Sequence, residues 1–252
     1  MNLAVETPCG SERLIEFNAV RSLESPELLH RHAVLWRLPA GTAICTTSDL
    51  AGRLVPGISP FLHHPAYPDG VFRCQLEEDD QAKYTANRRS ELPFHSDMAL
   101  FPEPPSVTLI RCIAPEPGPP PSDGAILLLH IEALMDALDH AERYDLVAFL
   151  REPRRLSFVD GTTTTAPMVP APVGSAPLRV FERIEGQLPM LERHMLRQVL
   201  SFCHSLGPTL IRIPLAAGYV VGLSNRHFLH SRAACASTAR VTEIFLGNIQ
   251  SG

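Results

Sequence analysis

The sequence predicts a mainly β protein, built as a sandwich or barrel of short strands with added helices. Its strand-like apolar segments are short and lie mostly toward the two ends of the chain, with helical patterns between them. Its 24 prolines outnumber its 15 glycines, and proline is disfavoured in helix interiors and central strands. Because the 252 residues contain neither a repeat nor a clear linker, we expect a single domain over residues 1–252.

The first half of the chain alternates short elements with long loops. Residues 33–38 (AVLWRL) have the character of a buried strand. Residues 46–54 begin with three capping side chains and end before a Pro-Gly pair, which predicts a short helix. Residues 57–91 contain several prolines and little periodicity, and we expect a long irregular segment that is either a functional lid or disordered. Residues 106–112 (SVTLIRC) alternate as a strand does.

The middle of the chain is where the helices begin. Residues 125–129 (AILLL) follow the proline-rich loop 116–124 and predict another buried strand. The apolar spacing over 130–150 is that of a helix. The low-complexity stretch 159–177 predicts a mobile excursion.

The last third returns to β structure. Residues 188–207 predict a second helix, closed by a Gly-Pro pair. Three strand-like segments follow it, at 209–215 (TLIRIPL), 218–224 (GYVVGLS) and 241–247 (VTEIFLG).

The composition disfavours several classes of protein. The net charge is −5, the opposite of a typical nucleic-acid binder. No segment reaches the roughly 18 apolar residues of a membrane span, and the first residues lack the pattern of a secretory signal. We therefore expect a cytoplasmic protein that binds neither nucleic acid nor membrane, with free thiols. The six cysteines are Cys9, Cys45, Cys74, Cys112, Cys203 and Cys235.

The tripeptide His95-Ser-Asp97 is the best local candidate for a metal site. A non-haem iron site uses two imidazoles and one carboxylate. Residues i and i+2 of a strand point the same way, so both side chains can face one metal ion. The pairs His130/Glu132 and His140/Glu142 are weaker, because the second lies in an expected helix where i and i+2 diverge.

The third ligand must come from a distant strand. His230, in the segment GYVVGLSNRHFLHSR, is the first choice and His227 is its competitor. Ten residues beyond His230, Arg240 opens an apolar strand, where a buried guanidinium needs an anionic partner. Thr242 faces the same side and offers a hydroxyl.

Together these segments resemble the taurine dioxygenase and clavaminate synthase-like family of Fe(II)/2-oxoglutarate oxygenases, which includes carbapenem synthase. The segments are ELPFHSDMALFPEPPSVTLIRCIAPE, DGAILLLHIEALMDAL, GYVVGLSNRHFLHSR and RVTEIFLGN. The resemblance covers residues 85–140 and 205–250. It implies a double-stranded β-helix, or jelly-roll, core with helices outside.

The resemblance also implies roles for single residues. His95, Asp97 and His230 match the iron ligands, and Arg240 matches the arginine that binds the distal carboxylate of 2-oxoglutarate, with Thr242 beside it. With O2, such an enzyme oxidises a small molecule, such as an amino acid or a natural-product intermediate, and releases succinate and CO2. Asp97 implies hydroxylation, desaturation or ring closure, because family halogenases have a small residue there.

The chain departs from the family pattern at three positions. Ile126 stands near the place of a threonine that helps to bind 2-oxoglutarate. Ile244 stands where many relatives have a second arginine, and Ser224 where many have the aspartate of an Asp-Asn-Arg run.

Three further arginines are candidates for substrate contact, each with a plainer alternative. Arg88 and Arg89 precede the metal motif and either meet an anionic substrate or are solvated charges. Arg111 lies on the strand 106–112 and is either a pocket residue or a partner in a salt bridge at the strand end.

Two other functions remain open from the residues alone. A zinc hydrolase would use the same three ligands plus water, but no His-Glu-x-x-His motif supports it. A jelly-roll binding protein that holds metal and turns over little or no 2-oxoglutarate is the other. The metal that co-purifies, and the conversion of 2-oxoglutarate to succinate, separate the three.

Overall fold

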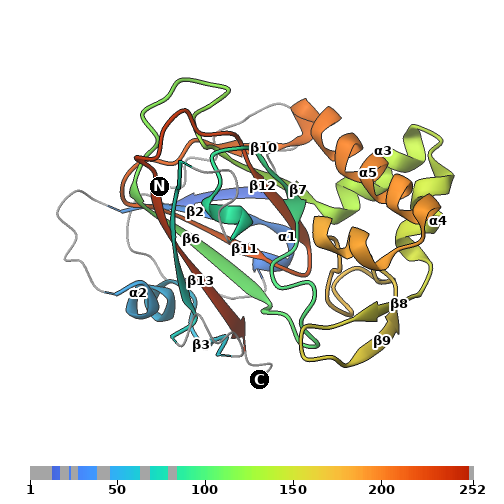
Figure 1. Cartoon of the computed structure of the whole chain (residues 1–252). Coiled ribbons are helices and arrows are strands. Elements are labelled where there is room, and N and C mark those ends of the chain that lie inside the picture. Colours follow the sequence, from blue (N-terminus) through green and yellow to red (C-terminus); the bar gives the residue numbers. More distant parts are fainter. Residues whose placement is uncertain are drawn as a thin grey trace.

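Two β-sheets that face each other form the centre of the protein, with helices outside them (Figure 1). The computed structural model describes residues 13–17, 23, 28–38, 46–62, 69–78 and 84–249. The larger sheet has the order β1-β2-β11-β6-β13-β3, with β4 also paired to β13. Its strands are β1 (Leu14–Phe17), β2 (Ala33–Arg37), β3 (Ile58–Pro60), β4 (Val71–Gln75), β6 (Val107–Ala114), β11 (Tyr219–Ser224) and β13 (Val241–Ile249).

The smaller sheet has the order β10-β7-β12-β5 and carries the metal motif at its edge. Its strands are β5 (Leu92–His95), β7 (Ile126–His130), β10 (Ile211–Ile213) and β12 (Phe228–Arg232). Alternation along the strands decides which side chains lie between the sheets. On β6, Ile110 and Cys112 point inward and pack with Leu128 of β7 and Phe228 of β12.

Helices cover the outer faces of both sheets (Figure 1). They are α1 (Leu28–Arg31), α2 (Thr47–Leu54), α3 (Ile131–His140), α4 (Tyr144–Arg151) and α5 (Met190–Ser205), with the short 3₁₀ helices η2 (Thr85–Asn87), η3 (Glu182–Gln187) and η4 (Gly207–Thr209). Helix α2 packs Leu50 and Leu54 against Trp36 of the larger sheet. Helices α3, α4 and α5 pack on the outer face of the smaller sheet, where Leu129 and Leu229 meet them.

Most of the expected elements are present. The strands expected at 33–38, 106–112, 125–129, 209–215, 218–224 and 241–247 correspond to β2, β6, β7, β10, β11 and β13. Thr46 caps α2 as expected, because its side chain accepts a hydrogen bond from the Asp49 N–H at 3.1 Å. The helix expected at 188–207 is α5.

The single helix expected over 130–150 is wrong, because the chain forms two helices there. Helix α3 ends at His140 and α4 begins at Tyr144. Between them, Glu142 has a φ of 55°, a left-handed conformation that no helix interior accommodates. Both helices turn their apolar faces toward the core. The apolar spacing therefore continues from one helix to the next, and this spacing predicted a single helix.

The two segments expected to be irregular contain short strands. Segment 57–91 includes β3, β4 and η2, while 63–68 and 79–83 lie outside the described residues. Segment 159–177 includes β9 (Thr163–Ala166), which pairs with β8 (Arg154–Ser157). Met168 and Val169 of this segment are fully buried among the helices.

Among the described residues, no helix has both the length and the apolar character that a membrane crossing needs.

Candidate metal centre and its cavity

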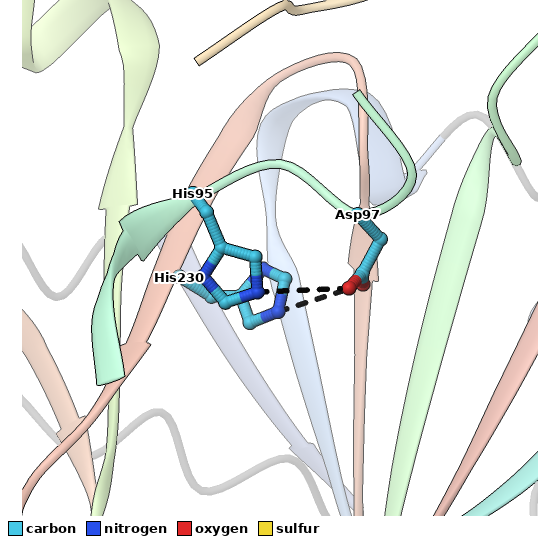
Figure 2. A group of neighbouring side chains, drawn as sticks. All are labelled: His95, Asp97 and His230. Atoms are coloured by element: carbon cyan, nitrogen blue, oxygen red, sulfur yellow. Dashed lines mark ion pairs between the residues drawn. The ribbon is translucent and has the colours of Figure 1, made fainter. Parts of the chain in front are cut away.

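The pairing of β5 with β12 brings His95 and His230 together. The two strands are antiparallel neighbours, and their register places His230 directly opposite His95. The ring centroids are 4.2 Å apart. Strand β5 ends at His95, so Asp97 lies in the turn that follows rather than on the expected strand. The turn nevertheless directs the Asp97 carboxylate toward both imidazoles (Figure 2).

The three side chains have the spacing of a metal site. The Nε2 atom of His95 lies 3.6 Å from Oδ1 of Asp97, and Nε2 of His230 lies 3.5 Å from Oδ2. One ligand atom from each residue lies within 4.8 Å of the other two. Two imidazoles and one carboxylate on a single face form the set that holds non-haem Fe(II) with open positions.

Neighbouring groups orient these ligands. His95 Nδ1 donates to the Pro93 carbonyl at 2.9 Å, which leaves Nε2 free to bind metal. The Thr108 hydroxyl donates to Asp97 Oδ2 at 2.6 Å. The Asn225 side chain accepts from the Asp97 N–H at 2.7 Å and donates to the Asp97 carbonyl at 2.9 Å. The carboxylate is therefore held through both its side chain and its peptide groups.

The electrostatics favour the protonation states that a metal requires. Burial lowers the pKa of His230 to about 4, against the opposing charge of Asp97, so the ring is neutral at pH 7. Burial alone would raise the pKa of Asp97. The positive charge that His230 carries when it is protonated in acid, and the hydrogen bonds from His95 and Thr108, outweigh it and hold the pKa of Asp97 well below its usual range. A neutral imidazole and an ionised carboxylate are both ready to coordinate.

A cavity of about 290 Å³ opens beside the three ligands. Arg240 and Thr242 line it together with His95, Asp97 and His230.

Arg240 has the properties of an anion site. Its side chain is almost wholly buried, and its Nε has no hydrogen-bond partner among the described residues. Burial and the neighbouring charge of Arg232 lower its pKa. A buried cation without a counter-ion is unfavourable, and a bound carboxylate relieves it.

Arg232 also lines the cavity, although no motif in the sequence marks it. Its two terminal nitrogens donate to the carbonyls of Arg88 and Ser90 and to the sulfur of Cys235. The guanidinium thus ties β12 to the chain that leads into β5. Its terminal nitrogens are therefore already used by the protein, while its buried Nε has no hydrogen-bond partner among the described residues.

The other three arginines proposed for substrate contact lie outside the cavity wall. Arg89 donates to Glu78 at 3.1 Å and to the Ala236 carbonyl at 2.6 Å. Arg88 contributes its backbone carbonyl to Arg232. On β6, Ile110 lines the cavity, so its neighbour Arg111 points to the opposite face.

Arg111 there lies 3.8 Å from Glu243 and donates to Thr47 at 3.1 Å. The salt-bridge alternative for Arg111 therefore matches the structure, and the pocket role does not.

The competing histidines have other positions. The His227 ring lies 2.9 Å from the Ser224 hydroxyl and stacks on His30, with ring centroids 4.9 Å apart. Burial lowers its pKa to about 4. His130 caps α3 by accepting from the Glu132 N–H at 3.3 Å. His140 is the exposed last residue of α3. The structure thus groups His230, and not His227, with His95 and Asp97.

Four residues near the site carried too weak a signal in the sequence. Asn225 and Thr108 are 128 and 11 residues from Asp97 along the chain, and polar residues at strand ends are common. Phe181 and Arg183 border the cavity, but they come from a segment without a motif. Only the tertiary structure brings these residues close to the proposed metal ligands.

The cysteines that the structure describes have free thiols, as the sequence predicted. Cys74, Cys112, Cys203 and Cys235 are free and buried, while Cys9 and Cys45 lie outside the described residues. Burial raises the pKa of Cys112 to about 11 and that of Cys203 to about 12, so these thiols are protonated at neutral pH.

Comparison with solved structures identifies the fold. An asparagine oxygenase, in a structure with Fe(II), 3-hydroxyasparagine and succinate, matches with a TM-score of 0.61 and 15% identity, covering 85% of this chain and 74% of its own. PvcB, an Fe, alpha-ketoglutarate-dependent oxygenase from an isonitrile synthetic pathway, matches at 0.56 and 18%, covering 86% and 76%. A taurine dioxygenase from Burkholderia xenovorans matches at 0.58 and 16%, covering 93% and 87%.

No family model and no curated protein matches the sequence. The structural matches confirm the predicted fold, which is mainly β with a jelly-roll core flanked by helices.

Proposed function

We propose that this protein is an Fe(II)/2-oxoglutarate-dependent oxygenase that oxidises a small molecule. One observation carries the proposal. A buried two-histidine, one-carboxylate set shares a cavity with Arg240, a buried arginine that has no counter-ion among the residues that the structure describes. The first fits Fe(II) and the second fits the distal carboxylate of 2-oxoglutarate. A zinc hydrolase would need the same ligands, but its reaction would not require the buried guanidinium of Arg240.

The residues that would hold the co-substrate come from one face of β13. Arg240 immediately precedes this strand, and Thr242 lies on it two residues later, also at the cavity wall. We propose that Thr242 supplies the hydroxyl that Ile126 does not. Ile126 and Ile244 line the same cavity and would pack against the carbon chain of 2-oxoglutarate.

The iron, with 2-oxoglutarate and O2, would supply the oxidising power, and the 2-oxoglutarate would leave as succinate and CO2. The protein's own part is to orient and to exclude water. Asp97 occupies the third ligand position, held by Thr108 and Asn225. A carboxylate there leaves no ligand position for chloride. The reaction that we propose is therefore hydroxylation, or the related desaturation or ring closure, and not halogenation.

Segment 57–91 forms part of the cavity wall. Strand β4 and helix η2 lie within segment 57–91 and supply Phe72, Tyr84 and Thr85 to the cavity wall. This placement supports a lid role for the segment. We propose one oxygenase domain that acts in the cytoplasm on an amino acid or a natural-product intermediate.

An anaerobic titration with Fe(II) and 2-oxoglutarate tests the proposal. Bidentate 2-oxoglutarate on Fe(II) gives a weak charge-transfer band in the visible range, and we expect this band in the wild type and in His227→Ala. We expect no band in His230→Ala, which lacks a ligand. Fe(II) binding without the band in the wild type would contradict the proposal, as would a band that survives loss of His230.

A further inference from the structure

The part of the cavity beyond the iron site and Arg240 is mainly apolar. Its wall includes aromatic and aliphatic side chains from five segments, namely Phe72, Tyr84, Met98, Phe101, Val159 and Phe181. Phe72 and Tyr84 meet edge to face, with centroids 5.5 Å apart. Phe181 approaches the metal ligand His95, with centroids 6.1 Å apart. A wall of this kind binds an apolar body rather than a strongly polar one.

One arginine in this wall, Arg183, has no role in the proposed iron and 2-oxoglutarate site. Three arginines line the cavity, Arg183, Arg232 and Arg240. Arg240 is assigned to 2-oxoglutarate, and Arg232 is bonded to backbone carbonyls. Arg183 is exposed, and within the described part of the chain its side chain donates one hydrogen bond, to the Thr85 hydroxyl at 3.2 Å. A guanidinium has five N–H donors, so most of them remain available.

Arg183 lies where a substrate would enter. It belongs to η3 and follows Phe181, the residue beside His95, by two positions. Its bond to Thr85 joins η3 to η2 at the cavity wall, although the two residues are 98 positions apart in the chain. If Arg183 binds the anionic group of a short molecule, the rest of that molecule would lie along the apolar wall. Its opposite end would then point toward the iron ligands.

We propose that the substrate is a carboxylic acid with an apolar, aliphatic or aromatic body, and that Arg183 binds its carboxylate at the cavity mouth. This inference rests on the proposed function and specifies its substrate class. The guanidinium is suited to the task because it can donate two parallel hydrogen bonds to a carboxylate. The apolar body would displace water from the wall that Phe181 and Tyr84 form.

Binding measurements with matched probes test this assignment. The protein is loaded with Fe(II) and saturating 2-oxoglutarate without oxygen, and dissociation constants are measured by calorimetry. The probes are 3-phenylpropanoate and 3-phenylpropan-1-ol, which share a body and differ in charge. L-Phenylalanine adds an ammonium group to the same acid. If L-phenylalanine binds more tightly than 3-phenylpropanoate, the substrate class is amino acids. If 3-phenylpropanoate binds more tightly, the class is acids without the amino group.

The variants isolate the role of Arg183. We expect 3-phenylpropanoate to bind wild type about tenfold more tightly than the alcohol, as an ion-paired hydrogen bond would give. Arg183→Gln should remove this advantage, and Arg183→Lys should keep part of it. Arg155→Gln, which changes an exposed arginine that does not line the cavity, should keep all of it.

Several outcomes would overturn the assignment. These are equal binding of acid and alcohol, an unchanged advantage in Arg183→Gln, or no binding of any probe. The charge-transfer band is recorded in the same samples. If the band forms while the preference for acids is absent, the substrate assignment fails and the oxygenase proposal stands. If the band itself is absent, the oxygenase proposal fails first.

Discussion

Asn225 holds both peptide groups of Asp97. Its side-chain oxygen accepts from the Asp97 N–H at 2.7 Å, and its side-chain nitrogen donates to the Asp97 carbonyl at 2.9 Å. The same nitrogen donates to the Pro105 carbonyl at 2.9 Å. Asp97 lies in a turn, where the strand ladder no longer fixes the backbone. One amide side chain therefore replaces the ladder and fixes the direction of the carboxylate.

Asn225→Ala should weaken metal binding without removing a ligand. Loss of the three hydrogen bonds frees the turn that carries Asp97, and lost supporting contacts of this kind cost roughly 10- to 100-fold in metal affinity. Fe(II) or Co(II) titration measures the change. Asn87→Ala is the control, because it removes a half-buried amide that donates to Glu77 and makes no contact with Asp97. Equal affinities in the two variants would show that Asn225 does not position the site.

Thr108→Val should have a smaller effect on the same affinity. The substitution keeps the shape of a buried side chain and removes the hydroxyl that donates to Asp97 Oδ2 at 2.6 Å. We expect a loss of about 3- to 10-fold, which corresponds to the typical net contribution of one hydrogen bond, about 0.7–1.4 kcal/mol. Thr165→Val, on the exposed side of β9, should bind metal as the wild type does. A loss as large as that of Asp97→Ala would mean that the site had collapsed.

Removal of any proposed ligand should abolish Fe(II) binding and turnover. His95→Ala, Asp97→Ala and His230→Ala each leave two ligands, too few for a stable site. His227→Ala should retain the metal, because that ring faces Ser224 and His30. Metal content after anaerobic loading and desalting gives the readout. Retention of iron after loss of both His95 and Asp97 would disprove the ligand assignment.

Arg240→Gln should weaken 2-oxoglutarate and spare iron. The substitution removes the buried charge that we assign to the distal carboxylate, and we expect the dissociation constant of 2-oxoglutarate to rise at least about tenfold. Fe(II) affinity should stay within about twofold of wild type. Arg111→Gln is the control, since that side chain pairs with Glu243 on the other face of the sheet. A weakened 2-oxoglutarate affinity in the control alone would reverse the assignment.

Gly124→Ala should disturb Arg240 through packing. A Cβ at Gly124 would lie 2.8 Å from the Cys235 sulfur and 2.9 Å from Cδ of Arg240, and the backbone φ is +60°. Gly161 has a φ of +84° with nothing within 4 Å. Both substitutions should lose about 1–2 kcal/mol of unfolding free energy from the left-handed backbone.

Only Gly124→Ala should also weaken 2-oxoglutarate, because only there would the new methyl group displace the guanidinium. Denaturant unfolding and 2-oxoglutarate titration on the two variants separate backbone strain from displacement. An equal 2-oxoglutarate affinity in both would show that Arg240 tolerates the added methyl group.

Local patterns in the sequence predicted the elements that form by local rules. The alternation of SVTLIRC and the apolar run AILLL became β6 and β7, and the capping pattern at Thr46 became the start of α2. The break between α3 and α4 escaped prediction, because the apolar period continues through Glu142 while the backbone there does not. Periodicity reports which face is buried and is silent about one or two turn residues.

By itself, the sequence determined six strand segments, the start of α2, helix α5 and the chemical type of the site, a His-x-Asp pair with a later histidine and arginine. The tertiary structure alone decided which histidine joined the pair, because the β5–β12 register places His230 opposite His95. It also decided that Arg111 faces away from the cavity, and that Asn225 meets Asp97 and Arg183 meets Thr85. These contacts join residues far apart in the chain, so they depend on strand pairing and packing, which no local pattern encodes.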